Sequence, residues 1–311
     1  MINLLISSKD AIDYVELIER AKIADLSIQI CPKDPALISD AHTIDVVLGE
    51  PNLCVDVLPH CPNVKWVQST WAGIKPFFDS APHDFKLTGV KDIFGPQMRE
   101  YVFSYLLHFA RKIQTFKDLQ TNRNWSQPLC APLQGKTIGI LGMGSIGTEI
   151  AKTAKHFGMH VIGIALNTRQ SDFVDKFYQL EQLQEFAHSL NYLVVLLPHT
   201  DKTENLIDKG FLSLLNHQCI LINAGRGQVI DENALLHALS HNQLQAAVLD
   251  VFINEPLAED HPFWGLDNLY ITQHTAAISK PDEIAKIFLQ NLRLFNRNEK
   301  LINLIDWQKG Y

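Results

Sequence analysis

Three side chains that could take part in catalysis, an arginine, a glutamate and a histidine, each come just after a predicted strand. They are Arg226 in the segment NAGRGQVIDE, Glu255 in LDVFINEP and His274 in TQHTAA. Ligands of doubly wound α/β sheets bind beyond the carboxyl ends of the strands. We therefore expect these three side chains to converge on one crevice.

The three residue types suit acid–base chemistry on an anionic compound. An imidazole exchanges protons near neutral pH, and a neighbouring carboxylate fixes the ring and favours its charged form. A guanidinium can grip a carboxylate through its planar fork. Singly, each residue has an ordinary structural explanation, because such a histidine, arginine or Glu-Pro turn is common in folded proteins. Their joint position after successive strands is what indicates a site.

A glycine fingerprint precedes these segments and predicts a dinucleotide site. Gly142, Gly144 and Gly147 form G-x-G-x-x-G, with Ser145 and Ile146 between the last two. The glycines allow a tight turn, close approach of a pyrophosphate and close helix–strand packing. The neighbouring elements fall in the expected order, namely a strand at 137–141, a helix at 148–157, a stop at Gly158 and a strand at 160–165. The alternative is a glycine-rich turn in an unrelated α/β protein.

The elements that position these residues alternate between strand and helix along the whole chain. In the first part, strands are expected at 2–6, 26–30, 44–48, 64–68 and 86–90, with helices at 11–24, 51–58 and 73–78. In the second part, strands are expected at 192–197, 218–223, 246–251 and 269–272, with helices at 207–215, 232–240 and 282–296.

This alternation predicts an α/β chain of two Rossmann-like, doubly wound parallel-sheet domains. A flavodoxin-like substrate domain would span residues 1–96 and be completed by 282–311. An NAD(P)-binding domain would span residues 97–281. The latter begins with one long predicted helix at 97–119, whose apolar residues lie on more than one face. Such a helix packs against another domain or subunit, so we expect a homodimer.

Composition excludes several other classes of protein. The 311 residues are 46% hydrophobic and 20% charged, with a net charge of -7 and no basic run, which argues against a nucleic-acid partner. The five scattered cysteines show no metal-ligand spacing, so we expect free thiols in a reducing compartment and no metal. No signal peptide and no apolar run of membrane-spanning length is visible. We expect a cytoplasmic protein without a membrane partner.

The chain resembles the D-isomer-specific 2-hydroxyacid dehydrogenase family, and most closely its glyoxylate/hydroxypyruvate reductase branch. The similarity covers nearly the whole chain. Besides the three segments above, it rests on QSTWAGI at 68–74, MREY at 98–101, LPHTDKTENLI at 197–207 and DWQKGY at 306–311.

The resemblance implies the roles of individual residues. His274 would donate the proton to the carbonyl oxygen, Glu255 would hold His274, and Arg226 would bind the substrate carboxylate. The turn Trp71-Ala72-Gly73-Ile74 would offer backbone N–H groups to the same carboxylate. Asp250 would orient the nicotinamide amide, and the cofactor groove would be lined by Leu197, Pro198, Thr203, Ala224 and Gly225. The family usually has Pro before the catalytic histidine, whereas this chain has Gln273.

The choice of cofactor depends on the end of the second strand of the fingerprint. A site that prefers NAD places Asp or Glu there, on the ribose 2′-hydroxyl. This strand instead runs into GIALNTR, with no acidic residue before Asp172. Arg169, helped by Asn167 and Thr168, could accept a 2′-phosphate. We therefore expect NADP(H) to be preferred, with NAD(H) possible.

The expected activity is NADPH-dependent reduction of a small 2-oxo acid, glyoxylate or hydroxypyruvate, to the 2-hydroxy acid. Trp71 beside the carboxylate-binding turn suggests a crowded pocket and hence a small substrate. Two alternatives stay open. One is a dehydrogenase for a different 2-hydroxy acid, and the other is a non-catalytic, cofactor-sensing, corepressor-like binding protein on the same scaffold.

Overall fold

The computed structural model describes residues 1–79, 84–164 and 171–307. The chain divides into two compact units, Met1–Ile93 with Ser279–Tyr311, and Phe94–Ile278. Each unit contains one sheet in which every pair of neighbouring strands is parallel. This architecture confirms the predicted fold class of two Rossmann-like α/β domains.

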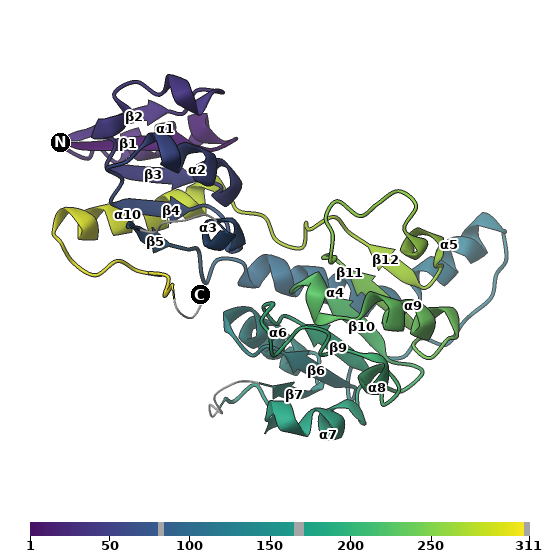
Figure 1. Ribbon diagram of the computed structural model, residues 1–311. Helices are drawn as coiled ribbons and strands as arrows, with labels where there is room; N and C mark the ends of the chain where they lie inside the picture. Colours follow the sequence, from purple (N-terminus) through teal and green to yellow (C-terminus); the bar gives the residue numbers. More distant parts are fainter. Residues whose placement is uncertain (80–83, 165–170, 308–311) are drawn as a thin grey trace. The chain divides into compact units, whose positions relative to one another are not determined.

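The first unit is built on a five-stranded sheet of order β2-β1-β3-β4-β5, which is the flavodoxin-like order (Figure 1). Its strands are β1 (Ile2–Ser7), β2 (Leu26–Ile30), β3 (Val46–Gly49), β4 (Trp66–Ser69) and β5 (Lys86–Thr88). Its helices are α1 (Ala11–Arg20), α2 (Pro51–Val57), α3 (Lys75–Asp79) and α10 (Pro281–Asn296).

Helix α10 belongs to this first unit although it lies far along the chain (Figure 1). Phe288 of α10 stacks on the buried Trp66 of β4, with ring centroids 5.2 Å apart. The buried Asn291 amide donates to Gln68 Oε1 at 3.2 Å. The predicted helix at 282–296 therefore forms and completes this core with both apolar and polar contacts.

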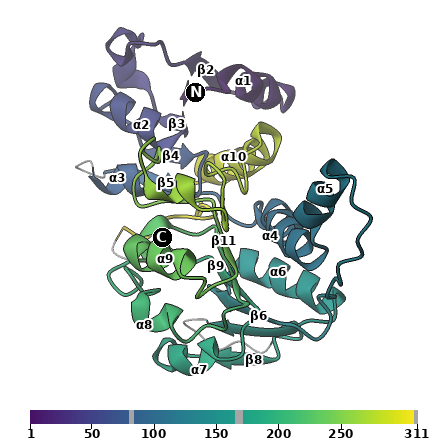
Figure 2. The ribbon, with the colours of Figure 1, turned by 90° about the vertical axis from the view of Figure 1, so that its right-hand side faces the viewer.

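The second unit contains a seven-stranded sheet of order β12-β11-β10-β9-β6-β7-β8 (Figures 1 and 2). Its strands are β6 (Thr137–Leu141), β7 (His160–Ile164), β8 (Lys176–Tyr178), β9 (Tyr192–Val195), β10 (Ile220–Asn223), β11 (Ala246–Leu249) and β12 (Leu269–Ile271). Its helices are α4 (Gly95–Ala110), α5 (Ile113–Thr121), α6 (Ser145–His156), α7 (Leu183–Ala187), α8 (Lys209–Leu212) and α9 (Glu232–Ser240).

Both faces of this second sheet are covered by helices because its strands are apolar on both sides. Successive side chains of a strand point to opposite faces. Ile222 of β10 thus joins a core cluster with residues of α4 and α6. Leu221 joins the cluster that contains residues of α7, α8 and α9. The buried sheet is the rigid support of the loops at its carboxyl edge.

The prediction of a single helix at 97–119 is wrong, because this stretch forms two helices, α4 and α5. Lys112 adopts a left-handed conformation with φ of 51°, and its N–H donates to Phe109 O at 3.1 Å, which ends α4. Helix α4 buries one face, whereas α5 has no buried residue among those described. Packing therefore does not hold the two segments in line.

Several shorter elements also differ from the prediction. The first helix ends at Arg20 and not at residue 24, and the helix expected at 207–215 is the short α8. Strand β8 and helix α7 were not predicted, because each is very short and has little periodicity. None of these differences moves a residue of the candidate site.

Candidate active site

The second sheet has a switch point between β6 and β9, where strand order reverses. If the strands are numbered from β6 along the chain, their order across the sheet is 3-2-1-4-5-6, with a seventh strand beside the sixth. Ligands of such sheets bind at the switch point, beyond the carboxyl ends of the strands. The glycine fingerprint follows β6, and the other segments follow β9, β10, β11 and β12. All the predicted site residues of this unit that the structure describes therefore lie at one edge of one sheet.

The glycine fingerprint has the geometry of a phosphate-binding turn. Gly142 adopts φ of 106°, and a Cβ on Gly147 would collide with the Gly142 carbonyl oxygen. Gly144 caps the N-terminus of α6, and a Cβ there would meet no atom of the described residues within 4 Å, so these residues leave the space over this end open. Ser145 and Ile146 are in the first turn, whose N–H groups have no intrahelical acceptor. This open, positive helix end fits a dinucleotide pyrophosphate.

The other predicted cofactor residues form two loops in close contact. A Cβ on Gly225 would lie 2.8 Å from the Leu197 carbonyl oxygen, so only glycine allows this approach. Thr203 is buried, and its hydroxyl donates to Pro198 O at 2.6 Å. Thr203 therefore shapes the loop from within. Ala224 continues β10, and its N–H donates to Val195 O at 3.2 Å.

The residues expected to select the cofactor, Asn167, Thr168 and Arg169, lie outside the described residues. The turn Trp71-Ala72-Gly73-Ile74 lies in the first unit, after β4. The Trp71 N–H donates to Ser69 Oγ at 3.1 Å and is already engaged. Within the described part of the chain, the N–H groups of the next three residues have no acceptor, and they stay available for an anion.

His274 and Glu255 form a direct pair. His274 Nδ1 lies 2.8 Å from Glu255 Oε2, and the Phe252 N–H donates to Glu255 Oε1 at 3.0 Å. A carboxylate only accepts, so Nδ1 carries the hydrogen and Nε2 points away from Glu255. The side chains are 52% and 36% exposed, which leaves Nε2 accessible to a substrate. The pair thus has the geometry of a positioned proton donor.

Asp250 holds the loop that carries His274. Its buried carboxylate accepts hydrogen bonds from Thr272 Oγ1 at 2.6 Å, the Thr275 N–H at 2.8 Å and the Ala276 N–H at 3.0 Å. The His274 N–H donates to Asp250 O at 2.8 Å, with His274 at φ of 56°. These bonds determine the loop conformation in a chain that has Gln273 before the histidine. A contact of Asp250 with nicotinamide stays a prediction.

Two further residues support Asp250 and were not predicted from sequence. Because the Thr272 hydroxyl donates to Asp250, Tyr101 of α4 must donate to Thr272, at 2.8 Å. Burial raises the pKa of Tyr101, so its phenol stays a donor throughout the physiological range. Tyr101 ends the MREY segment of the resemblance, but nothing in the sequence connects it with Thr272, which lies 171 residues further along the chain.

Arg226 is held in a tight turn after β10. Buried Asn223 donates through Nδ2 to Arg226 O at 3.0 Å and accepts from the Gly225 N–H at 3.1 Å. Arg226 Nη1 donates to Gly225 O at 2.6 Å. Burial lowers the pKa of the Arg226 guanidinium, and the nearby Glu255 carboxylate raises it. The structure thus brings Arg226, Glu255 and His274 together at one edge.

Among the described residues, no group of three or more His, Cys, Asp or Glu side chains is arranged to hold a metal ion. None of the helices described combines the length and apolarity needed to span a membrane.

Comparisons with known proteins point in the same direction as the geometry. The sequence pattern described as "D-isomer specific 2-hydroxyacid dehydrogenase, NAD binding domain" matches residues 103–276. A glyoxylate/hydroxypyruvate reductase A from Photorhabdus laumondii is 33% identical over 217 residues, which are 70% of this chain and 69% of the relative.

Solved structures are similar over the whole chain. A D-isomer-specific 2-hydroxyacid dehydrogenase family protein from Aeromonas salmonicida has a TM-score of 0.94 and 37% identity, covering 98% of this chain and 99% of its own. An NADPH-dependent glyoxylate/hydroxypyruvate reductase from Sinorhizobium meliloti, in complex with NADP and sulfate, has a TM-score of 0.90 and 25% identity over 100% of both chains.

Proposed function

Because the chain belongs to the D-isomer-specific 2-hydroxyacid dehydrogenase family, we propose that it reduces glyoxylate or hydroxypyruvate with NADPH. The observation that carries this proposal is the 2.8 Å pair between His274 Nδ1 and Glu255 Oε2, on the same sheet edge as Arg226 and the glycine fingerprint. The similarity to glyoxylate/hydroxypyruvate reductases supports the substrate class.

The reaction needs a hydride on the carbonyl carbon and a proton on the carbonyl oxygen. When bound, the reduced nicotinamide supplies the hydride. His274 donates the proton from Nε2, while Glu255 holds the ring through Nδ1 and stabilises its charge. Arg226 binds the substrate carboxylate and polarises the adjacent carbonyl. The product 2-hydroxy acid keeps its carboxylate, and His274 is reprotonated from solvent.

The open N-terminus of α6 would hold the pyrophosphate of the cofactor. Arg169, Asn167 and Thr168 would receive the 2′-phosphate, and no acidic residue is present between Ile164 and Asp172 to repel it. The Sinorhizobium meliloti reductase was crystallised with NADP, which supports a preference for NADP(H) over NAD(H). In the turn Trp71-Ala72-Gly73-Ile74, the N–H groups of the last three residues would add backbone donors to the substrate carboxylate.

Steady-state kinetics test this proposal directly. We would follow NADPH and NADH oxidation with glyoxylate, hydroxypyruvate, pyruvate and a bulky phenyl-substituted 2-oxo acid. The proposal predicts the highest kcat/KM for the first two acids with NADPH. Equal or better efficiency with NADH would contradict the cofactor assignment. NADPH binding without turnover of any acid would instead favour a cofactor-sensing binding protein.

A further inference from the structure

The backbone of Ile253, close to the catalytic pair in the chain, is held by hydrogen bonds through both its N–H and its carbonyl group. The Ile253 N–H donates to Glu232 Oε1 at 3.0 Å. The Ile253 carbonyl accepts from Gln228 Nε2 at 3.1 Å. Ile253 lies two residues before Glu255, and its neighbour Phe252 donates its N–H to Glu255 Oε1. Movement of this peptide would therefore move the carboxylate that holds His274.

Both partners of this peptide follow Arg226 in the chain. Gln228 belongs to the 3₁₀ turn Gly227–Val229, and Glu232 is the first residue of α9. A Cβ on Gly227 would collide with the Phe252 and Ile253 backbone, so the two segments pack main chain against main chain. The two hydrogen bonds thus connect the segment that carries Arg226 with the segment that carries Glu255.

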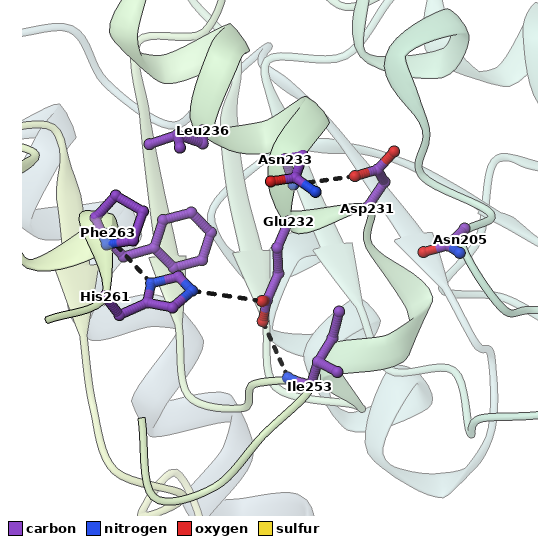
Figure 3. Close-up of a pocket in the computed structure, with 9 residues that line it drawn as sticks. Asn205, Asp231, Glu232, Asn233, Leu236, Ile253, His261 and Phe263 are labelled. Carbon is purple, nitrogen blue, oxygen red and sulfur yellow. Dashed lines mark hydrogen bonds and ion pairs between the residues drawn. The ribbon is translucent and has the colours of Figure 1, made fainter. Parts of the chain in front are cut away.

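Glu232 is itself held in place (Figure 3). Its side chain is 18% exposed, and Oε2 lies 3.7 Å from His261 Nε2. His261 Nδ1 accepts from the Phe263 N–H at 3.3 Å, so the hydrogen of a neutral ring is on Nε2, facing Glu232. Asp231 caps α9 by accepting from the N–H groups of Asn233 and Ala234. Glu232 therefore stands on a fixed helix end.

Apolar burial ends at Phe252, which is 5% exposed, and does not extend to the Ile253 side chain. The Ile253 side chain is 38% exposed and borders a cavity of about 390 Å³, which Glu232 and His261 also line (Figure 3). Because core packing does not fix the backbone at this exposed position, hydrogen bonds must fix it. The hydrogen bond that Gln228 donates and the one that Glu232 accepts fix this backbone.

We propose that Glu232 and Gln228 are positioning residues that set the spacing of Arg226 and Glu255. The proposal rests on the proposed function, because it assigns these residues to the same reaction. The competing explanation is that Glu232 only stabilises the N-terminus of α9 through its charge. The two explanations differ in whether the acceptor oxygen or the charge matters, and in whether kcat responds.

The test compares Glu232→Ala, Glu232→Gln and Gln228→Ala with wild type, and takes Asn233→Ala as matched control. Asn233 lies in the same helical turn and lines the same cavity, and among the described residues its side chain has no hydrogen bond to the 253 loop. Readouts are kcat and KM with glyoxylate, the Kd of NADPH by fluorescence, and the melting temperature.

We expect kcat to fall at least about tenfold in Glu232→Ala and Gln228→Ala, because small displacements of catalytic groups cost that much or more. The Kd of NADPH should change less than twofold, and Glu232→Gln, which keeps an acceptor oxygen, should restore most of kcat. Values of kcat in both alanine variants within twofold of Asn233→Ala would overturn the proposal. Equal losses in Glu232→Gln and Glu232→Ala would also overturn it.

Two features of the design keep the result interpretable. If Glu232→Ala does not fold, Gln228→Ala decides, since Gln228 lies outside α9. If wild type turns over no 2-oxo acid, the proposed function fails. The positioning proposal fails separately, when wild type is active and the variants match the control.

Discussion

Arg226 illustrates how a buried turn fixes the direction of one side chain. The Asn223 side chain donates to Arg226 O and accepts from the Gly225 N–H, and the Arg226 guanidinium donates to Gly225 O at 2.6 Å. Only some of its five donors are used in this way, so the rest of the planar fork can bind an anion. The position of Arg226 is set by main-chain contacts and does not require the substrate.

We predict that Arg226→Lys lowers kcat/KM for glyoxylate about 10- to 100-fold, mainly through KM, because an ammonium cannot make the paired hydrogen bonds of the fork. The Kd of NADPH should be unchanged. The control is Arg123→Lys, at an exposed arginine of the same unit. A KM equal to that of wild type would show that Arg226 does not bind the carboxylate.

Residue types and order were enough to predict the candidate catalytic residues, but not the residues that support them. Arg226, Glu255 and His274 stand after strands in recognisable segments. Asn223 and Thr272 also end or follow strands, yet an Asn or a Thr there is usual in any turn. Their roles arise from contacts between segments distant in sequence, which a single sequence does not show.

At the scale of elements, the loop after β12 depends on a carboxylate that follows β11. Asp250 accepts three hydrogen bonds from residues 272–276 and accepts the His274 N–H through its main chain. Strands β11 and β12 are neighbours in the parallel sheet, so their carboxyl ends lie close enough for Asp250 to reach the loop after β12 directly.

We predict that Asp250→Asn lowers kcat at least about tenfold and destabilises the protein by about 1–3 kcal/mol. The new amide would direct its own donors at an N–H of Thr275 or Ala276, and the loop with His274 would shift. Tyr101→Phe is the milder comparison, since it removes only the outer hydrogen bond to Thr272. Measurements are urea unfolding, kcat and the Kd of NADPH. A change confined to the Kd would instead support a nicotinamide contact as the main role of Asp250.

Helices and strands were predicted correctly where their sequence pattern is long or where a glycine marks their end. The fingerprint strand β6 forms at residues 137–141 as predicted, and Gly158 ends α6 with φ of 69°. The break at Lys112 was missed, because neither Gly nor Pro marks it and the apolar pattern continues into Ile113 and Phe116. These two side chains are exposed in α5, so the pattern there does not reflect burial within the chain.

At the scale of the whole molecule, this exposed apolar surface supports the expected homodimer. The apolar surface of α4 is partly covered within its own unit, where Phe103 stacks on Phe157 with ring centroids 5.1 Å apart. The large apolar side chains that stay exposed in α5 and the following connector are Ile113, Phe116, Trp125 and Leu129. A second copy of the chain would cover them.

Light scattering after gel filtration tests this expectation. We predict a mass of about 70 kDa, twice the 35.2 kDa of one chain. The double variant Phe116→Asp with Leu129→Asp should shift the mass toward one chain, because charges would enter an apolar interface. A wild-type mass of about 35 kDa at micromolar concentration would refute the homodimer.

Buried thiols provide a separate test of the cores of both units. Burial raises the pKa of Cys219 to about 12 and the pKa of Cys54 well above its usual value, which is reinforced by Glu50 and Cys31 for Cys54. Alkylation requires the thiolate, whose fraction at pH 8 is on the order of 10⁻⁴ for a pKa four units higher. We predict that iodoacetamide at pH 8 leaves both thiols unmodified in the native protein and modifies the half-exposed Cys130.

Mass spectrometry of the peptides reads this outcome, and the urea-unfolded chain serves as the control in which all five cysteines react. Modification of native Cys219 as fast as that of Cys130 would contradict the burial of Cys219, which directly precedes β10. Protection of Cys54 and Cys219 together would show that both cores are formed in solution.

The proposed reaction depends above all on His274, which donates the proton that accompanies hydride transfer. The most direct test of this role is single-turnover oxidation of bound NADPH by glyoxylate, followed at 340 nm for wild type and His274→Ala. We expect a rate about 10²- to 10⁴-fold lower in the variant, with the Kd of NADPH unchanged. A rate in His274→Ala within about tenfold of wild type would contradict the role of His274 as proton donor.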